Sequence, residues 1–171
     1  MSDNLPDALT ALATRVVEEN RDAGLRIAVA ESCTGGLVAA AITEVAGCSA
    51  VFEGGFVSYS NQFKQQHLHV AGDVLETFGA VSVATAWAMA QGVLAVTDAD
   101  VAVAITGIAG PGGGSEKKPV GTVVFARATR DGDPDEVVAD LREFGDLGRA
   151  AIRRQAALCA LELLLPPHPQ G

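Results

Sequence analysis

The segment Glu31–Gly36, ESCTGG, places a serine directly before a glycine-rich turn. Ser32 would lie where a strand ends and a helix begins, so its hydroxyl would face a cleft. The N–H groups of the following turn could then bind an anion or an oxyanion. This arrangement follows the logic of a nucleophile elbow, although the G-x-S-x-G pattern is missing. The alternative is that Ser32 or Thr34 only caps the helix.

A serine nucleophile needs a base, and Lys64 is the best candidate. A lysine buried beside a cleft has a lowered pKa and can accept the serine proton. Tyr59, the one tyrosine of the chain, ends the preceding strand and could relay a proton or orient a substrate. The alternatives are an exposed helix charge for Lys64 and a packing role for Tyr59. His67 and His69 are two residues apart and share no helical face, so we expect surface or packing roles for them.

Cys33 is an alternative nucleophile, because cysteine is intrinsically more reactive than serine. Its side chain should point away from that of Ser32, into the sheet packing. We therefore favour a buried structural role for Cys33, and likewise for Cys48 and Cys159. The spacing of the three cysteines fits no zinc pattern.

A second glycine-rich segment, Thr106–Gly114, follows the strongest predicted strand. Such a loop lets backbone amides approach a phosphate or a sugar closely. It matches neither nucleotide-binding glycine motif, so neither nucleoside triphosphate hydrolysis nor dinucleotide binding follows. A flexible connection is the alternative. Ser115–Pro119 could form a mobile lip, and Arg149 could supply a cation for a phosphate, unless it is a surface arginine.

The elements that must position these residues follow from hydrophobic periodicity. The patterns predict strands over 26–30, 54–60, 101–106, 120–130 and 136–144, and helices over 2–20, 34–47, 61–68, 83–96 and 149–165, with a further short helix and loop within 72–82. The last two strands should form an antiparallel hairpin. We expect a three-layer α/β/α sandwich with a mixed, mostly parallel sheet of about five or six strands. Ligands bind beyond the carboxyl ends of parallel strands, where loops 31–36 and 107–119 would meet.

Length and composition exclude several classes of protein. The 171 residues are enough for one domain, and 49% hydrophobic with 19% charged residues excludes intrinsic disorder. A net charge of −9 makes binding to nucleic acid or to an anionic membrane surface unfavourable. No apolar run reaches the length of about 18 residues that a membrane span needs. The N-terminus has no signal-peptide pattern, so we expect a reducing cytoplasm.

Several segments together resemble the CinA C-terminal-domain family, the nicotinamide-mononucleotide amidohydrolases. They are Ala30–Gly36, Phe52–Lys64, Gly79–Ser82, Ala104–Ala126 and the R-x-x-I-R helix segment Arg149–Arg153. These pieces occur in the family's order and cover nearly the whole chain. The resemblance implies a three-layer α/β/α fold. It also implies hydrolysis of the carboxamide of nicotinamide mononucleotide to nicotinic acid mononucleotide and ammonia, with neither a metal nor a redox cofactor.

The same resemblance implies roles for individual residues. By position, Ser32 matches the nucleophile, Lys64 the base and Tyr59 a site tyrosine. The residues that match the substrate-binding region are Thr34, Gly35, Gly36, Asn61, Thr106, Gly107, Gly110, Gly112, Gly113 and Arg149, the last as a phosphate contact. Before the final helix the chain has FGDLGR, one residue more than the family's usual F-x-G-D-R.

Many family members carry a second, N-terminal molybdopterin-binding-like domain. Here we expect residues 1–166 to form a single amidohydrolase domain and residues 167–171 a disordered tail. Two other functions stay open: a non-catalytic nucleotide-binding sensor or partner module, and an amidase for a related nucleotide. The combination of Ser32, Tyr59 and Lys64 favours an enzyme, since a pure binder needs no desolvated lysine. We expect a small-molecule nucleotide substrate and a homo-oligomer.

Overall fold

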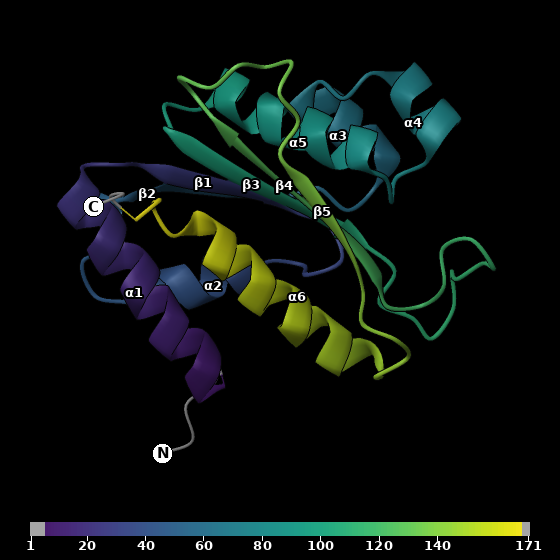
Figure 1. Cartoon of the computed structure of the whole chain (residues 1–171), viewed down its shortest axis with the longest axis horizontal. Helices are drawn as coiled ribbons and strands as arrows, with labels where there is room; N and C mark the ends of the chain where they lie inside the picture. Colours follow the sequence, from purple (N-terminus) through teal and green to yellow (C-terminus); the bar gives the residue numbers. More distant parts are fainter. Residues whose placement is uncertain (1–5, 169–171) are drawn as a thin grey trace.

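The computed structural model describes residues 6–168, which form one mixed sheet between two layers of helices (Figure 1). The strands are β1 (Ile27–Glu31), β2 (Phe52–Val57), β3 (Val101–Gly107), β4 (Thr122–Thr129) and β5 (Ala139–Glu143). The helices are α1 (Asp7–Ala23), α2 (Leu37–Thr43), α3 (Asn61–Leu68), α4 (Gly72–Phe78), α5 (Val83–Val96) and α6 (Arg149–Leu164), with a short 3₁₀ turn, η1, at Cys48–Ala50.

The strand order is β2-β1-β3-β4-β5. β1 pairs in parallel with β2 and β3, whereas β4 is antiparallel to both β3 and β5. Among the described strands β4 therefore runs against the other four. The predicted mixed, mostly parallel sheet with a late hairpin is confirmed, at five strands.

The strand alternation divides the core into two halves. Bulky side chains of β1 and β3 face α1, α2 and α6, and small ones face α5, because successive residues of a strand point to opposite faces. The bulky set is Ile27, Val29, Val101, Val103 and Ile105, and the small set is Ala28, Ala30, Ala102 and Ala104. The alanines allow α5 to lie close to the sheet.

A glycine lets α3 lie directly against α5. A Cβ atom on Gly92 would lie 2.0 Å from the carbonyl oxygen of Leu68, the last residue of α3. No side chain fits at this distance, so the glycine allows the end of α3 to approach α5 closely. Because α3 also carries Lys64, this contact helps to position the candidate base.

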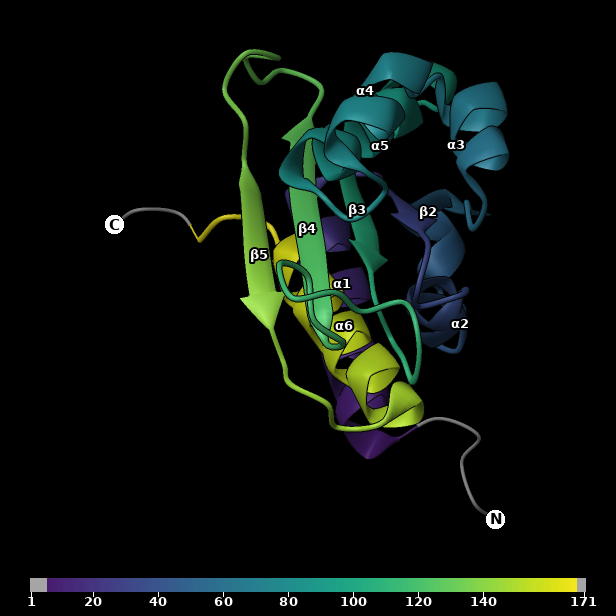
Figure 2. The same cartoon turned by 90° about the vertical axis from the view of Figure 1, so that its right-hand side faces the viewer.

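Several predicted boundaries differ from the observed ones. The predicted helix over 34–47 is shorter, since Gly35 and Gly36 have left-handed backbone and α2 begins only at Leu37. β5 begins at Ala139 and forms an exposed edge of the sheet (Figure 2). Of the expected tail, residues 169–171 lie outside the described residues. None of the helices within residues 6–168 is long and apolar enough to cross a membrane.

Candidate active site

Ser32 and Lys64 meet at the carboxyl end of β1. Lys64 Nζ lies 3.1 Å from Ser32 Oγ and 3.0 Å from the carbonyl oxygen of Tyr59. Both side chains are covered, with Ser32 8% and Lys64 1% exposed. The backbone N–H of Ser32 donates to the carbonyl of Ile105 at 2.9 Å, which ties the serine to β3. The two residues are thus held together by the sheet and by α3.

The local sequence explains why Lys64 points at the serine. The hydroxyl of Ser60 accepts a hydrogen bond from the N–H of Phe63 and so starts α3 directly after the Tyr59 carbonyl. Lys64 follows one helical turn later. Within the described residues no carboxylate forms an ion pair with it. Burial therefore dominates and lowers the pKa of the Lys64 ammonium group. A neutral amine here can accept the Ser32 proton while it donates to the Tyr59 carbonyl.

Tyr59 is connected to both ends of the site. Its carbonyl contacts Lys64, while its phenol oxygen accepts a hydrogen bond from Arg149 at 3.0 Å. The side chain is 58% exposed. Arg149 also donates to the carbonyl of Gly110 at 2.7 Å. Despite the extra residue in FGDLGR, Arg149 thus begins α6 within reach of the glycine loop. No hydrogen bond joins the phenol to Ser32 or Lys64 within residues 6–168, so a proton relay through the phenol stays a prediction.

Glu31 is a site residue that the sequence reasoning missed. It is 1% exposed, and its carboxylate accepts the N–H groups of Val38 at 2.9 Å and Ala39 at 3.1 Å. The carboxylate thus binds the free amides at the start of α2 and stabilises the end of the Ser32 turn. The sequence did contain a signal for this role, because Glu31 ends an otherwise apolar strand just before a glycine turn. A carboxylate buried at such a place needs hydrogen-bond donors, and the amides of the following turn and helix are the nearest ones.

Arg153 is the second missed residue. Its Nε donates to the carbonyl of Cys33 at 3.0 Å and its Nη2 to the carbonyl of Thr34 at 3.1 Å. The signal was the R-x-x-I-R pattern, since residues four apart lie on the same helical face. Arg149 and Arg153 accordingly both point from α6 toward the site.

The turn itself combines buried and accessible residues. Thr34 is completely buried, and its hydroxyl has no hydrogen-bond partner in the described part of the chain. Gly35 is exposed and Gly36 half-buried, with φ values of +59° and +101° that favour glycine. The N–H of Gly36 has no partner within residues 6–168. Cys33 is 5% exposed, and its burial raises the pKa of the thiol to about 11, which supports a structural role.

The glycine loop is tied to the last residue of α4 and to the segment that follows it. The hydroxyl of Thr106 donates to the carbonyl of Ala80 at 2.8 Å, and Lys118 Nζ donates to the carbonyl of Phe78 at 2.8 Å. Gly107 has no room for a side chain, because a Cβ there would lie 2.8 Å from Val123 and 3.1 Å from the Cys33 sulfur. The loop is therefore held at both of its ends.

The remaining candidates lie at the surface around this site. Gly112, Gly113 and Asn61 are exposed, and their contacts with a substrate stay predictions. His67 and His69 are exposed as well, and the His67 ring packs on Phe63 with centroids 4.1 Å apart. Within residues 6–168 no group of three or more His, Cys, Asp or Glu side chains could hold a metal ion.

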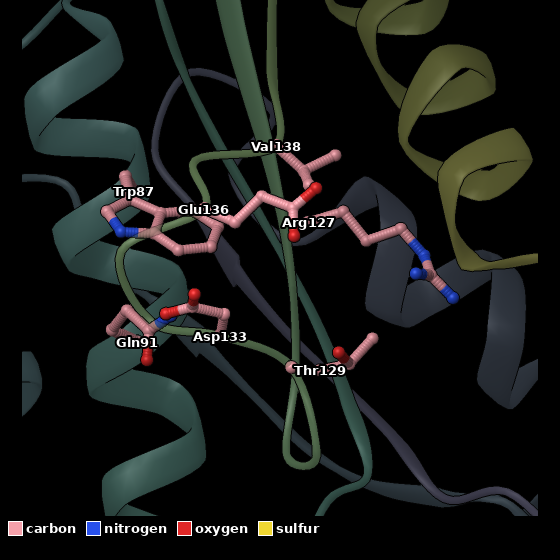
Figure 3. A pocket seen from close by; sticks show the side chains of 8 residues that line it. Trp87, Gln91, Arg127, Thr129, Asp133, Glu136 and Val138 are labelled. Atoms are coloured by element: carbon pink, nitrogen blue, oxygen red, sulfur yellow. The ribbon is translucent and has the colours of Figure 1, made fainter.

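A cavity of about 130 Å³ lies elsewhere, between α5 and the turn that joins β4 to β5 (Figure 3). Trp87, Arg127, Thr129 and Val138 contribute to its walls. Thr129 is at the far end of β4 from Val123, which pairs with the Gly107 end of β3. The cavity lining includes none of the candidate residues.

The sequence of this domain matches a known family along nearly its whole length. The model of the CinA C-terminal domain matches residues 9–166. The chain belongs to the CinA C-terminal domain family. This CinA C-terminal domain shares 48% identity over 156 residues with the nicotinamide-nucleotide amidohydrolase PncC of Escherichia coli K12. The alignment covers 91% of this chain and 92% of that protein.

Other members of the family have a comparable sequence identity to this CinA C-terminal domain. PncC of Enterobacter agglomerans is 51% identical over 143 residues, covering 83% of this chain and 84% of that protein. A CinA-like protein of Syntrophobacter fumaroxidans is 48% identical, but the chain spans 34% of its length. The crystal structure of the competence/damage inducible protein CihA from Agrobacterium tumefaciens superimposes with a TM-score of 0.90 at 47% identity, covering 95% of this chain and 97% of that one. The expected family and fold are confirmed.

Proposed function

We propose that this CinA C-terminal domain hydrolyses the carboxamide of nicotinamide mononucleotide to nicotinic acid mononucleotide and ammonia. The observation that carries the proposal is the 3.1 Å contact between Ser32 Oγ and the buried Lys64 amine. The high identity with relatives named nicotinamide-nucleotide amidohydrolase supports the substrate. The proposed reaction needs a nucleophile, a base and an oxyanion site, and each has a candidate among the described residues.

In the first half of the reaction, neutral Lys64 takes the Ser32 proton and Ser32 Oγ forms a bond to the amide carbon. The carbonyl oxygen becomes an oxyanion. When the tetrahedral intermediate collapses, the C–N bond breaks, and the Lys64 ammonium returns the proton to the leaving nitrogen, which departs as ammonia. The pyridinium charge of the substrate helps, because it makes the carboxamide more electrophilic and disfavours a second cation at Lys64.

In the second half, a water molecule attacks the acyl-enzyme and Lys64 accepts its proton. The bond between Ser32 Oγ and the acyl carbon then breaks, the proton returns to Ser32, and nicotinic acid mononucleotide is released. We assign the oxyanion to the amides of the Ser32–Gly36 turn. The Gly36 N–H is the most accessible candidate, since Gly36 is half-buried and Thr34 is not exposed. One such donor contributes about 3 kcal/mol in comparable enzymes.

The substrate phosphate is assigned to Arg149. Its guanidinium is exposed, and it already bridges Tyr59 and the Gly110 carbonyl across the opening of the site. The planar fork of arginine binds phosphate oxygens two at a time. The exposed loop glycines Gly112 and Gly113 are proposed to approach the ribose phosphate through their backbone.

The test is ammonia release from nicotinamide mononucleotide in the presence of a chelator. Wild type and Cys33→Ala are expected to turn over, and Ser32→Ala is expected to be inactive although folded. Full activity of Ser32→Ala would rule out the nucleophile. If folded wild type shows thermal stabilisation by the nucleotide but no turnover, the protein is a binding module.

Two further expectations are part of this proposal. We propose a homo-oligomer, supported by exposed apolar side chains at both ends of α5, Val83 and Val96, and at Phe78 of α4. A monomeric mass in light scattering would contradict it. We also propose a reducing cytoplasmic location, supported by the free thiols of Cys33, Cys48 and Cys159.

A further inference from the structure

Arg153 connects α6 to the turn that carries Ser32. It lies in the second turn of α6, a helix whose buried face includes Ile152, Ala156 and Ala157. From this fixed helix the guanidinium donates to the carbonyls of Cys33 and Thr34, 120 and 119 residues away in the sequence. The two residues that follow the serine are therefore fixed by a side chain from the other end of the chain.

The Arg153 guanidinium donates to these two neutral carbonyls and not to a carboxylate. The ion pairs within residues 6–168 join Arg15 to Glu19, Arg21 to Asp22, Arg26 to Glu53 and Arg142 to Asp140, and none includes Arg153. A guanidinium presents its N–H groups in a rigid plane, so two carbonyls held at 3.0 and 3.1 Å have little freedom to rotate.

Fixing the two carbonyls also fixes the peptide groups on either side of Thr34. In a planar trans peptide the C=O and the N–H point in opposite directions, so the Thr34 carbonyl orients the N–H of Gly35. That N–H donates to the carbonyl of Ser32 at 3.1 Å. A Cβ on Gly35 would lie 3.1 Å from Nη2 of Arg153, so the glycine also leaves space for the guanidinium.

We propose that Arg153 is a positioning residue: it holds the Ser32–Gly36 turn in the conformation that keeps the Ser32 hydroxyl beside Lys64. Glu31 fixes the other end of the turn through Val38 and Ala39. The inference rests on the proposed amidohydrolase reaction and assigns Arg153 no contact with the substrate. It distinguishes Arg153 from Arg149, which lies one helical turn earlier and is exposed.

The first experiment compares the kinetics of Arg153→Gln and Arg154→Gln. Arg154 is the matched control, because it is exposed, lies on the same helix and its side chain forms no hydrogen bond or ion pair within the described residues. Arg153→Gln is expected to lower kcat about 100-fold, because the Ser32 hydroxyl would no longer be held in its reactive position. KM is expected to change little, because Arg153 does not contact the substrate. Arg154→Gln is expected to behave as wild type. A raised KM with unchanged kcat would make Arg153 a substrate ligand and overturn the proposal, as would wild-type values of both.

The second experiment is independent of activity. Hydrogen exchange of residues 31–39 is expected to accelerate in Arg153→Gln while the amides of α6 stay protected, and to stay unchanged in Arg154→Gln. Arg153→Lys, which keeps the charge but lacks the fork, is expected to have an intermediate kcat and intermediate exchange. Unchanged exchange in Arg153→Gln would overturn the positioning role. Absence of turnover in wild type would instead contradict the proposed function, so the two failures are distinguishable.

Discussion

Glu31 and Ser32 are neighbours in the chain, yet their side chains lie on opposite faces of the sheet. Glu31 binds the first amides of α2, whereas Ser32 contacts Lys64 of α3. Strand alternation causes the separation, because successive side chains point to opposite faces. The separation matters for Lys64, since a carboxylate beside its amine would favour the ammonium form and remove the base.

Replacing Lys64 by methionine should abolish turnover and change how stability depends on pH. Burial lowers the pKa of Lys64 in the folded protein, while the unfolded chain has the ordinary value of about 10.4. At a pH between the folded and the unfolded pKa of Lys64, the unfolded state binds more protons than the folded state. Lys64 therefore makes the free energy of unfolding rise with pH in this range. Denaturant titrations at several pH values in this range should show that the free energy of unfolding of wild type, relative to that of Lys64→Met, increases with pH.

The same pKa shift predicts the pH dependence of wild-type turnover. Activity should fall as pH drops through the lowered pKa, because the amine becomes protonated, and this fall should lie below the ordinary lysine range. Measuring kcat against pH tests this. Substantial turnover by a folded Lys64→Met protein would remove Lys64 from the mechanism.

Replacing Arg149 by glutamine should raise KM for nicotinamide mononucleotide and change kcat little. A hydrogen bond to a charged group contributes about 1.5–3 kcal/mol, which corresponds to an increase of about tenfold or more. Steady-state kinetics at several salt concentrations would measure this, with Arg154→Gln as the control. An unchanged KM would mean that the phosphate binds elsewhere.

Replacing Glu31 by glutamine should destabilise the protein by about 1–3 kcal/mol and lower kcat. The amide side chain keeps one acceptor oxygen, so the N–H of Val38 or of Ala39 is left buried without a partner. Glu44 is the matched control, because it is exposed at the opposite end of α2. Glu44→Gln should leave stability and kcat near wild type. Equal denaturation midpoints for the two variants would contradict the role given to Glu31.

Replacing Gly92 by alanine should destabilise the protein and reduce turnover together. The new methyl group would collide with the Leu68 carbonyl and force α3, with Lys64, away from α5. Overpacking of this kind costs about 1–3 kcal/mol. Gly54→Ala is the control, since nothing lies within 4 Å of a Cβ there. Thermal unfolding and ammonia release would be measured on both, and wild-type values for Gly92→Ala would contradict the contact.

The sequence by itself determined the elements that local pattern specifies. The helices predicted over 61–68 and 83–96 coincide with α3 and α5, and the strands, the late hairpin and the two glycine loops were also placed. The position of Ser32 between an apolar strand and a glycine turn follows from the sequence and agrees with the structure, whereas its role as a nucleophile stays a prediction. Helix and strand periodicity, capping and glycine turns depend on residues close together in the chain.

Only the tertiary structure decided which of these residues meet. The packing of α3 on α5 decides whether Lys64 reaches Ser32. The packing of α6 on the sheet decides whether Arg149 meets the Tyr59 phenol and whether Arg153 binds the turn. Glu31 was missed because the amides that it binds become neighbours only when α2 folds back over β1. The orientation and burial of a side chain depend on elements distant in sequence, and local periodicity carries no information about them.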